Sequence, residues 1–123
     1  MGEGWSDIMA MMVLAKSSDT ATTRVTIGAY IYKPSAGIRS HPYTTDMRVN
    51  PLTYVDMRPV LSPCYSHATL PSLSARNAII TADVNHYGGA NKCEIYKAFA
   101  KRGLGSEATN LSTNDFSVPS ECQ

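Results

Sequence analysis

The chain has 123 residues, enough for one modest domain, and carries a formal net charge of +1 with 17% charged residues. It contains no run of like charges, so composition gives no indication of a nucleic-acid or membrane-surface partner. No apolar run reaches the roughly 18 residues that a membrane-spanning helix requires. Composition therefore indicates a soluble globular protein and excludes these classes without naming a function.

Residues 2–16 predict a helix that begins with two carboxylates and continues with residues that are apolar on every side. Glu3 and Asp7 are four residues apart, so on a helix both project from one face, one turn apart. An all-round apolar helix is expected in a protein interior, where carboxylates need a partner to stay charged. A metal ion with histidine ligands would be such a partner. The alternative is two acidic residues favoured by the dipole at a helix N-terminus.

The next segment, Arg24 to Tyr32, is rich in β-branched and aromatic residues and predicts a short strand or extended arm that stops at Pro34. Residues 33–63 carry five of the seven prolines and predict a long irregular segment. A loop of this length is usually functional or held by something outside it.

Two further helices are predicted after residue 72. Ser72 or Ser74 can cap the first, and Gly88-Gly89 ends it. The second begins at Asn91, which forms a capping-box-like pair with the residue three positions on, and Gly103 supplies its C-terminal stop. The pair predicts a helical hairpin whose apolar stripes belong to the core. The segment after Gly105 is rich in Ser, Thr and Asn, which favours a mobile tail.

Residues 1–7, Met-Gly-Glu-Gly-Trp-Ser-Asp, resemble the zinc-glutamate motif of the fungalysins, secreted metalloendopeptidases with a thermolysin-like catalytic domain. In that family a His-Glu-x-x-His helix supplies two zinc ligands and the general base. The resemblance implies that Glu3 is the third zinc ligand. It also implies that Asp7 hydrogen-bonds a ligand histidine and fixes its tautomer.

The runs at residues 37–47 and 49–54 resemble the fungalysin segment that passes close to the substrate cleft, and residues 88–105 resemble the end of the peptidase unit. The resemblance covers roughly residues 1–54 and 72–105. It makes three side chains candidates for the cleft wall: Arg39, His41 and Tyr43.

The sequence also departs from the family pattern. No His-Glu-x-x-His occurs, because His41, His67 and His86 each stand alone, and their spacing predicts no common metal site. The family places that motif shortly before the glutamate motif, so it is expected upstream of Met1, on a chain cut at its N-terminus. A Val-His-containing helix that follows the Asn-Pro-x-Thr-Tyr run in the family is missing after Tyr54, which predicts an internal deletion. Tight zinc sites take three or four ligands, so the chain alone is expected to be inactive.

The three cysteines show no Cys-x-x-Cys spacing, so no structural zinc site is expected. The family carries cysteines at the places of Cys64 and Cys93, and the resemblance implies a disulfide between them. Two reduced thiols remain the alternative, and Cys122 is the cysteine left over. Asn110-Leu111-Ser112 is an acceptor sequence for N-glycosylation.

These patterns together predict a mainly α fold: a partial thermolysin-like C-terminal helical subdomain with a long irregular segment and at most a short strand pair. Residues 1–105 are expected to be the C-terminal portion of a fungalysin-like metallopeptidase domain, and residues 106–123 a flexible polar tail. The expected function is that of a fragment of a secreted, extracellular zinc metalloendopeptidase, which uses a Zn²⁺-activated water to hydrolyse peptide bonds in proteins. Its expected partners are a protein or peptide substrate and the missing N-terminal part of the peptidase domain or a propeptide. The alternative is a non-catalytic secreted helical module that binds a protein partner.

Overall fold

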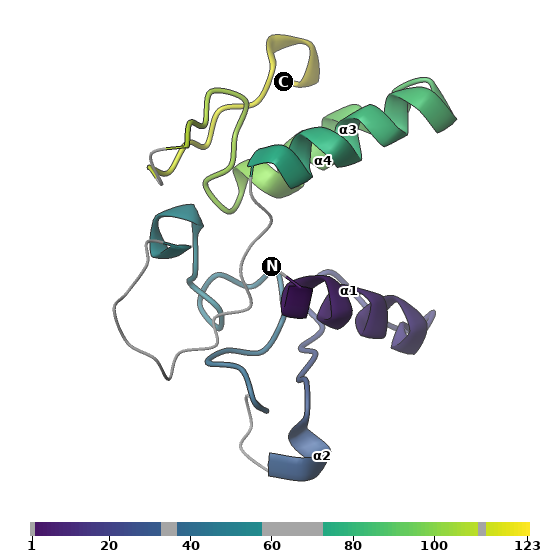
Figure 1. Ribbon diagram of the computed structural model, residues 1–123, viewed down its shortest axis with the longest axis vertical. Helices are drawn as coiled ribbons and strands as arrows, with labels where there is room; N and C mark the ends of the chain where they lie inside the picture. Colours follow the sequence, from purple (N-terminus) through teal and green to yellow (C-terminus); the bar gives the residue numbers. More distant parts are fainter. Residues whose placement is uncertain (1, 33–36, 58–72, 111–112) are drawn as a thin grey trace. The chain divides into compact units, whose positions relative to one another are not determined.

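The computed structural model describes residues 2–32, 37–57, 73–110 and 113–123 (Figure 1). Within these ranges the fold is mainly α, as predicted, and β structure is limited to three isolated bridges. The described residues divide into two compact units, residues 2–52 and residues 53–57 with 73–123. No helix in these ranges is long and apolar enough to cross a membrane. The helices are α1 (Gly2–Leu14), α2 (Ala29–Tyr32), α3 (Leu73–Tyr87) and α4 (Lys92–Ala100), with short 3-10 helices η1 (Tyr54–Met57) and η2 (Ser120–Cys122).

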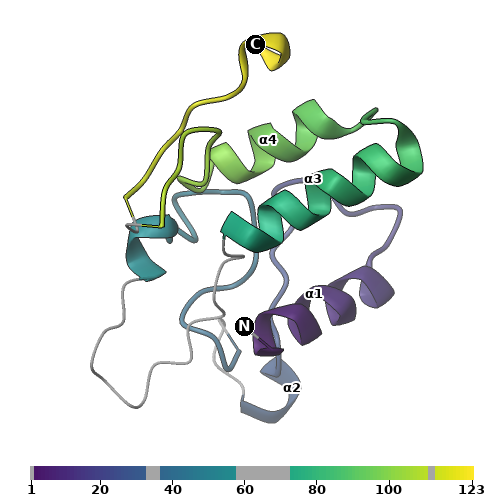
Figure 2. The same ribbon diagram turned by 45° about the horizontal axis from the view of Figure 1, so that its top comes forward.

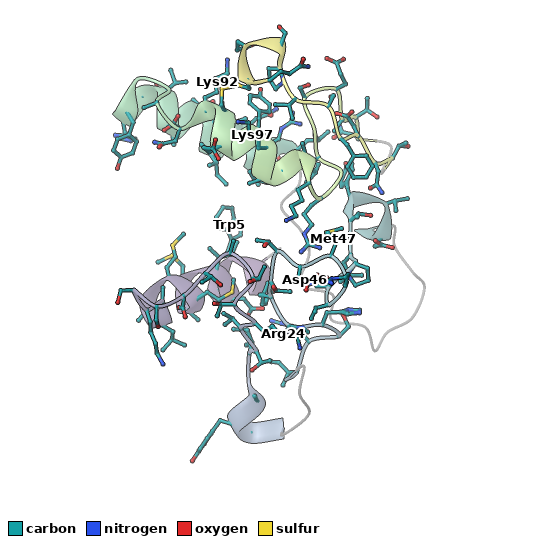
Figure 3. The ribbon with its side chains drawn as sticks, turned by 180° about the vertical axis from the view of Figure 1, so that it is seen from behind. Trp5, Arg24, Asp46, Met47, Lys92 and Lys97 are labelled. Atoms are coloured by element: carbon teal, nitrogen blue, oxygen red, sulfur yellow. A yellow bond between two sulfur atoms is a disulfide. The ribbon has the colours of Figure 1, made fainter. Side chains whose placement is uncertain are left out.

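Helix α1 opens the first unit and ends two residues earlier than predicted, before a turn in which Asp19 accepts a hydrogen bond from the Lys16 backbone N–H at 2.8 Å. The prediction that this helix is buried is wrong. Met9 and Val13 are 59% and 81% exposed, and Trp5, which projects from the helix, is 45% exposed (Figure 3). The described residues bury the side of α1 that carries Asp7, whereas the last three residues of the helix, Met12, Val13 and Leu14, are 67%, 81% and 66% exposed.

The predicted strand over residues 24–32 is reduced to two bridges followed by α2. Val25 and Tyr43 exchange both backbone hydrogen bonds at 2.8 Å, and Ile27 pairs with Gly37. The extended run then stops at Gly28, whose φ of 71° turns the chain into α2. The left-handed conformation that glycine permits therefore overrides the β propensity of the residues after it.

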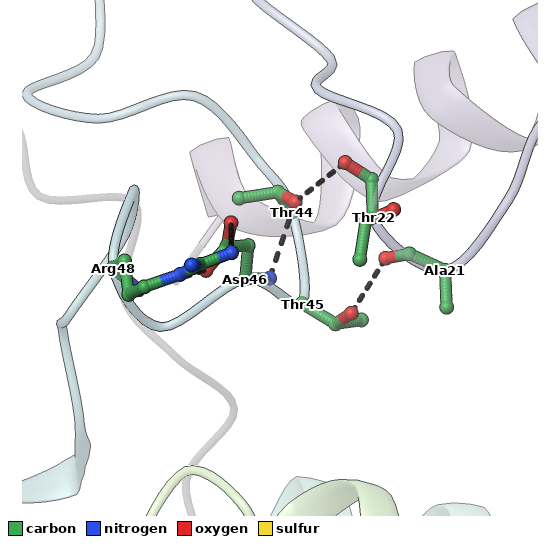
Figure 4. Close-up of polar contacts among 6 residues, drawn as sticks. All are labelled: Ala21, Thr22, Thr44, Thr45, Asp46 and Arg48. Carbon is green, nitrogen blue, oxygen red and sulfur yellow. Dashed lines mark hydrogen bonds and ion pairs between the residues drawn. The ribbon is translucent and has the colours of Figure 1, made fainter.

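The described part of the long irregular segment is held by hydrogen bonds between side chains and the backbone. Thr44 Oγ1 donates to the Thr22 carbonyl at 3.1 Å, and Thr45 Oγ1 donates to the Ala21 carbonyl at 2.6 Å (Figure 4). The Thr44 hydroxyl also accepts from the Asp46 N–H at 3.2 Å. These contacts continue the Val25–Tyr43 bridge and fix the backbone beside Tyr43.

Helices α3 and α4 lie side by side as the predicted hairpin of the second unit, with the break at Gly88-Gly89 (Figure 2). The predicted capping role of Asn91 is wrong. Asn91 precedes α4, but its side chain makes no cap hydrogen bond; its Nδ2 donates to Asp83 Oδ1 at 2.8 Å and its backbone N–H to Asp83 Oδ2 at 3.1 Å. The buried Asp83 carboxylate thus accepts two hydrogen bonds from Asn91 and holds the turn between the helices.

Core formation in the second unit differs from the predicted apolar stripe on α3. The buried residues of α3 are polar, Arg76 and Asp83, whereas Val84 and Tyr87 are exposed. The Arg76 guanidinium donates to the carbonyl oxygens of Leu104 and Gly105. Because Leu104 is fully buried, α3 holds the segment after α4 through a charged side chain that satisfies buried carbonyls.

Helix α4 ends at Ala100, and Gly103, with a φ of 82°, turns the chain as predicted. Residues 106–110 and 113–123, whose composition favours a flexible tail, return along this turn. The Gly105 N–H donates to the Asp115 carbonyl at 2.7 Å, and the Asp115 N–H donates to the Gly103 carbonyl at 2.9 Å. These backbone hydrogen bonds pair part of the segment with the turn at Gly103, a contact that side-chain composition does not predict; a flexible tail over residues 106–123 stays a prediction.

The predicted pairing of Cys93 with Cys64 is wrong in this structure. Cys93 forms a disulfide with Cys122, with a Cα–Cα distance of 5.0 Å. Helix η2 contacts α4 and places Cys122 within reach, and Lys92 Nζ forms an ion pair with Glu121 at 3.0 Å beside it. Cys64 lies outside the described residues.

Candidate functional site

Two of the candidate side chains from the irregular segment, Arg39 and Tyr43, meet at the Asp7 carboxylate. Arg39 donates to it at two points, from Nε to Oδ2 at 2.8 Å and from Nη2 to Oδ1 at 3.0 Å. The Tyr43 hydroxyl donates to Oδ2 at 2.7 Å. The side chains of Asp7 and Arg39 are only 6% and 8% exposed. The result is a buried, bidentate arginine–carboxylate pair with an additional hydroxyl donor.

Local structure explains why these side chains converge. Asp7 is held on the covered side of α1. Arg39 lies two residues after Gly37, where an added Cβ would clash with the Ile27 carbonyl oxygen, so only glycine permits this close approach. Tyr43 is placed by its bridge to Val25.

The surroundings of Asp7 and Tyr43 shift their pKa values in opposite directions, so Asp7 stays charged and Tyr43 keeps its proton. Burial works against the charged form of Asp7, but hydrogen bonds from Arg39 and Tyr43 and the positive charge of Arg39 hold its pKa below the usual value. Burial, followed by the hydrogen bond to Asp7 and its negative charge, raises the pKa of Tyr43 far above its usual value. At neutral pH, Asp7 is therefore a carboxylate and Tyr43 a neutral hydroxyl donor.

The remaining candidates lie apart from this cluster or outside the described residues. Glu3 belongs to α1, one turn before Asp7, but its side chain lies outside the described part of the structure. His41 contacts Ser40, with 3.2 Å between its Nδ1 and the serine Oγ. Asn110 is exposed, and the serine of its acceptor sequence is not among the described residues.

A metal ion would need several His, Cys, Asp or Glu side chains that converge on one point. Among the described side chains no group of three or more His, Cys, Asp or Glu is placed to hold a metal ion. The Asp7 oxygens receive hydrogen bonds from Arg39 and Tyr43, so this carboxylate is arranged as an acceptor rather than as a ligand. The arrangement fits a residue that orients a neighbouring group and does not fit a complete metal site.

The Asp7–Arg39 ion pair joins residues that are 32 positions apart, and the sequence does not predict it. No periodicity links a helix to an irregular segment; helical spacing drew attention to Asp7, and only the family resemblance drew attention to Arg39. The sequence also does not predict the burial of Arg76 and Asp83, two polar residues that a helical pattern alone assigns to the solvent-exposed face.

A family model described as fungalysin metallopeptidase (M36) matches residues 1–70 and 60–108 of the chain. Curated relatives include extracellular metalloproteinase 4 of Arthroderma otae, 35% identical over 85% of this chain and 24% of its own length. Extracellular metalloproteinase 1 of Phaeosphaeria nodorum is 32% identical over 99% of this chain and 28% of its own length. Extracellular metalloproteinase mep of Aspergillus niger is 31% identical, with shares of 93% and 26%.

The chain therefore spans about a quarter of the length of these relatives. Their alignments run over 159 to 174 residues, more than the 123 residues of this chain, so the relatives carry residues in the matched region without a counterpart here. This agrees with an internal deletion. Their names place them outside the cell and support a secreted, extracellular location for this chain. The match over most of its length shows that the chain belongs to the fungalysin metallopeptidase family.

Proposed function

We propose that this chain supplies part of the active site of a secreted zinc metalloendopeptidase that hydrolyses peptide bonds in proteins. In this proposal Glu3 is the third zinc ligand and Asp7 orients a ligand histidine. The observation that carries it is the buried Asp7 carboxylate, kept ionised by Arg39 and Tyr43 one helical turn after Glu3. A buried carboxylate with strong donors is the type of group that fixes a metal-bound imidazole in other metal sites.

Zinc, when bound in such a site, acidifies a water to a pKa of about 7 and polarises the scissile carbonyl. A catalytic zinc requires three protein ligands, and the described residues do not bring three together. The histidines and the general base must therefore come from polypeptide other than these residues. We propose that the 123-residue chain alone does not hydrolyse proteins. Arg39, His41 and Tyr43 would line the substrate cleft of the assembled site.

The exposed apolar side of α1 supports a requirement for additional polypeptide. Five large side chains on α1 are exposed: Trp5, Met9, Met12, Val13 and Leu14. An apolar surface of this kind on one helix is typical of an interaction site. The proposed occupant is the remaining part of the peptidase domain or a propeptide.

The proposal can be tested by measuring zinc content and casein hydrolysis. The purified chain is examined alone and mixed with a synthetic peptide that carries the family's His-Glu-x-x-His helix, called here the zinc-helix peptide. We expect neither zinc nor proteolysis with the chain alone, and one zinc per complex when the peptide is present. Stoichiometric zinc with proteolysis by the chain alone would contradict its inactivity. The absence of zinc uptake by the mixture would contradict the proposed role in the metal site.

A second candidate function is a non-catalytic secreted module that binds a protein partner. The same exposed residues of α1 favour it, because they would be available to any apolar partner. A chain that melts cooperatively as a soluble monomer and does not bind the zinc-helix peptide would support this function over the first.

A further inference from the structure

The hydrogen bonds at Asp7 are distributed unequally between its two oxygens. An ionised carboxylate offers about four acceptor positions, two on each oxygen. Oδ2 accepts from both Arg39 Nε and the Tyr43 hydroxyl, whereas Oδ1 accepts from Arg39 Nη2. Among the donors that the described residues supply, Oδ1 therefore receives one and Oδ2 two, which leaves the acceptor position for a further donor on Oδ1.

Arg39 alone would not produce this inequality. Its two-point contact gives one hydrogen bond to each oxygen and leaves the oxygens equivalent as acceptors. The Tyr43 hydroxyl, at 2.7 Å from Oδ2, makes them different. Tyr43 is well placed to do so, because its backbone exchanges two 2.8 Å hydrogen bonds with Val25. The next residue, Thr44, is tied to Thr22.

We propose that Tyr43 is a positioning residue that fills Oδ2 of Asp7, so that an imidazole N–H of a zinc-ligand histidine is received at Oδ1. This inference rests on the proposed function and adds to it the residue that decides the orientation of the supporting carboxylate. The proton of that imidazole must lie on the nitrogen that does not bind the metal, and its acceptor fixes both tautomer and ring direction. A carboxylate with two equivalent oxygens could receive the imidazole N–H at either oxygen. Because the Tyr43 hydroxyl occupies Oδ2, only Oδ1 is left to receive it.

The first test uses the 123-residue chain alone and the variant Tyr43→Phe, which removes the hydroxyl and keeps the ring. The ¹³C signal of the Asp7 carboxyl is followed by NMR as the pH is lowered. We expect the signal to move and the pKa of Asp7 to rise in the variant, because a donor to its charged form is lost. The matched control is Tyr30→Phe, in which the same atom is removed from a side chain that is 97% exposed. An Asp7 signal that is identical in the wild type and Tyr43→Phe would overturn the proposal.

The second test measures zinc affinity in the mixture with the zinc-helix peptide. Loss of groups that orient a metal ligand typically weakens metal binding about 10–100-fold, and we expect about tenfold for Tyr43→Phe, with no change for Tyr30→Phe. Failure of the wild-type mixture to bind zinc would contradict the proposed function, and the NMR comparison would still decide the contact between Tyr43 and Asp7. Equal zinc affinity of wild type and Tyr43→Phe would overturn this inference alone.

Discussion

Arg39 donates two hydrogen bonds to the carboxylate of Asp7, at 2.8 and 3.0 Å. This contact joins an irregular segment to helix α1 across 32 residues of sequence. Both side chains are almost fully buried. The pair is therefore a structural tie within the first unit as well as the centre of the candidate site. Its two roles can be separated by measuring stability and zinc binding independently.

The variant Arg39→Met is expected to lower the free energy of unfolding by about 3 kcal/mol, because it leaves a buried carboxylate without its charged partner. Urea unfolding measures this loss. The matched control is Arg48→Met, which removes an exposed arginine paired with Asp46 and is expected to leave stability nearly unchanged. Equal effects of the two variants would contradict a buried, stabilising Asp7–Arg39 pair.

Acid should weaken the first unit through Asp7. The pKa of Asp7 in the folded chain lies below its ordinary value of 3.8, so the unfolded state binds this proton at higher pH than the folded state does. The stabilisation is therefore present above about pH 4 and is lost as the pH falls through the folded-state pKa. Unfolding measured between about pH 6 and pH 2 should show less acid dependence for Asp7→Asn than for the wild type. Identical acid profiles would show that Asp7 has no lowered pKa.

Removal of the disulfide tests the correction to the predicted cysteine pairing. The bridge joins residues separated by 29 positions, so loss of it in the double variant Cys93→Ser with Cys122→Ser should cost about 3–4 kcal/mol in the chain-entropy model. Peptide mapping without reductant should recover a peptide of Cys93 linked to one of Cys122. The variant Cys64→Ser should keep that linkage. A peptide that links Cys64 to Cys93 would contradict the pairing.

Asn110 is exposed and begins an acceptor sequence, so secretion from a eukaryotic host should add one N-linked glycan. Mass spectrometry before and after glycosidase treatment measures it. The variants Asn110→Gln and Ser112→Ala should both lack the glycan, because each removes one required residue of the acceptor sequence. A glycan retained in Asn110→Gln would place the modification elsewhere.

The elements that the sequence predicted well are those with a local cause. The helix over residues 2–14 follows from its apolar run, and the hairpin of α3 and α4 follows from periodicity and from Gly88-Gly89. Gly103 ends the second helix of the hairpin because a positive φ costs glycine little. The sequence also named Asp7, Arg39 and Tyr43 as candidates, although family resemblance and not spacing selected the latter two.

The predictions that failed depend on contacts between distant residues. Asn91 has the position of a cap, but its backbone and side-chain N–H groups donate to the buried Asp83, and its side chain makes no hydrogen bond to the helix N–H groups. Cys93 has two possible partners, and only the return of the chain along α4 selects Cys122. Burial of α1 was inferred from its apolar sequence, which cannot tell whether the covering residues belong to the same compact unit. Each of these predictions failed because a tertiary contact decided the outcome, and residue propensity and spacing do not predict tertiary contacts.

The most direct test of the account measures zinc dissociation constants for the mixture of this chain with the zinc-helix peptide, using wild type, Glu3→Gln and Asp7→Asn. We predict that Glu3→Gln abolishes tight binding, because a ligand is lost, and that Asp7→Asn weakens it about 10–100-fold, because only the orientation of a ligand is lost. Zinc bound with the same affinity by all three chains would contradict the claim that the two carboxylates of α1 were arranged around a metal ion.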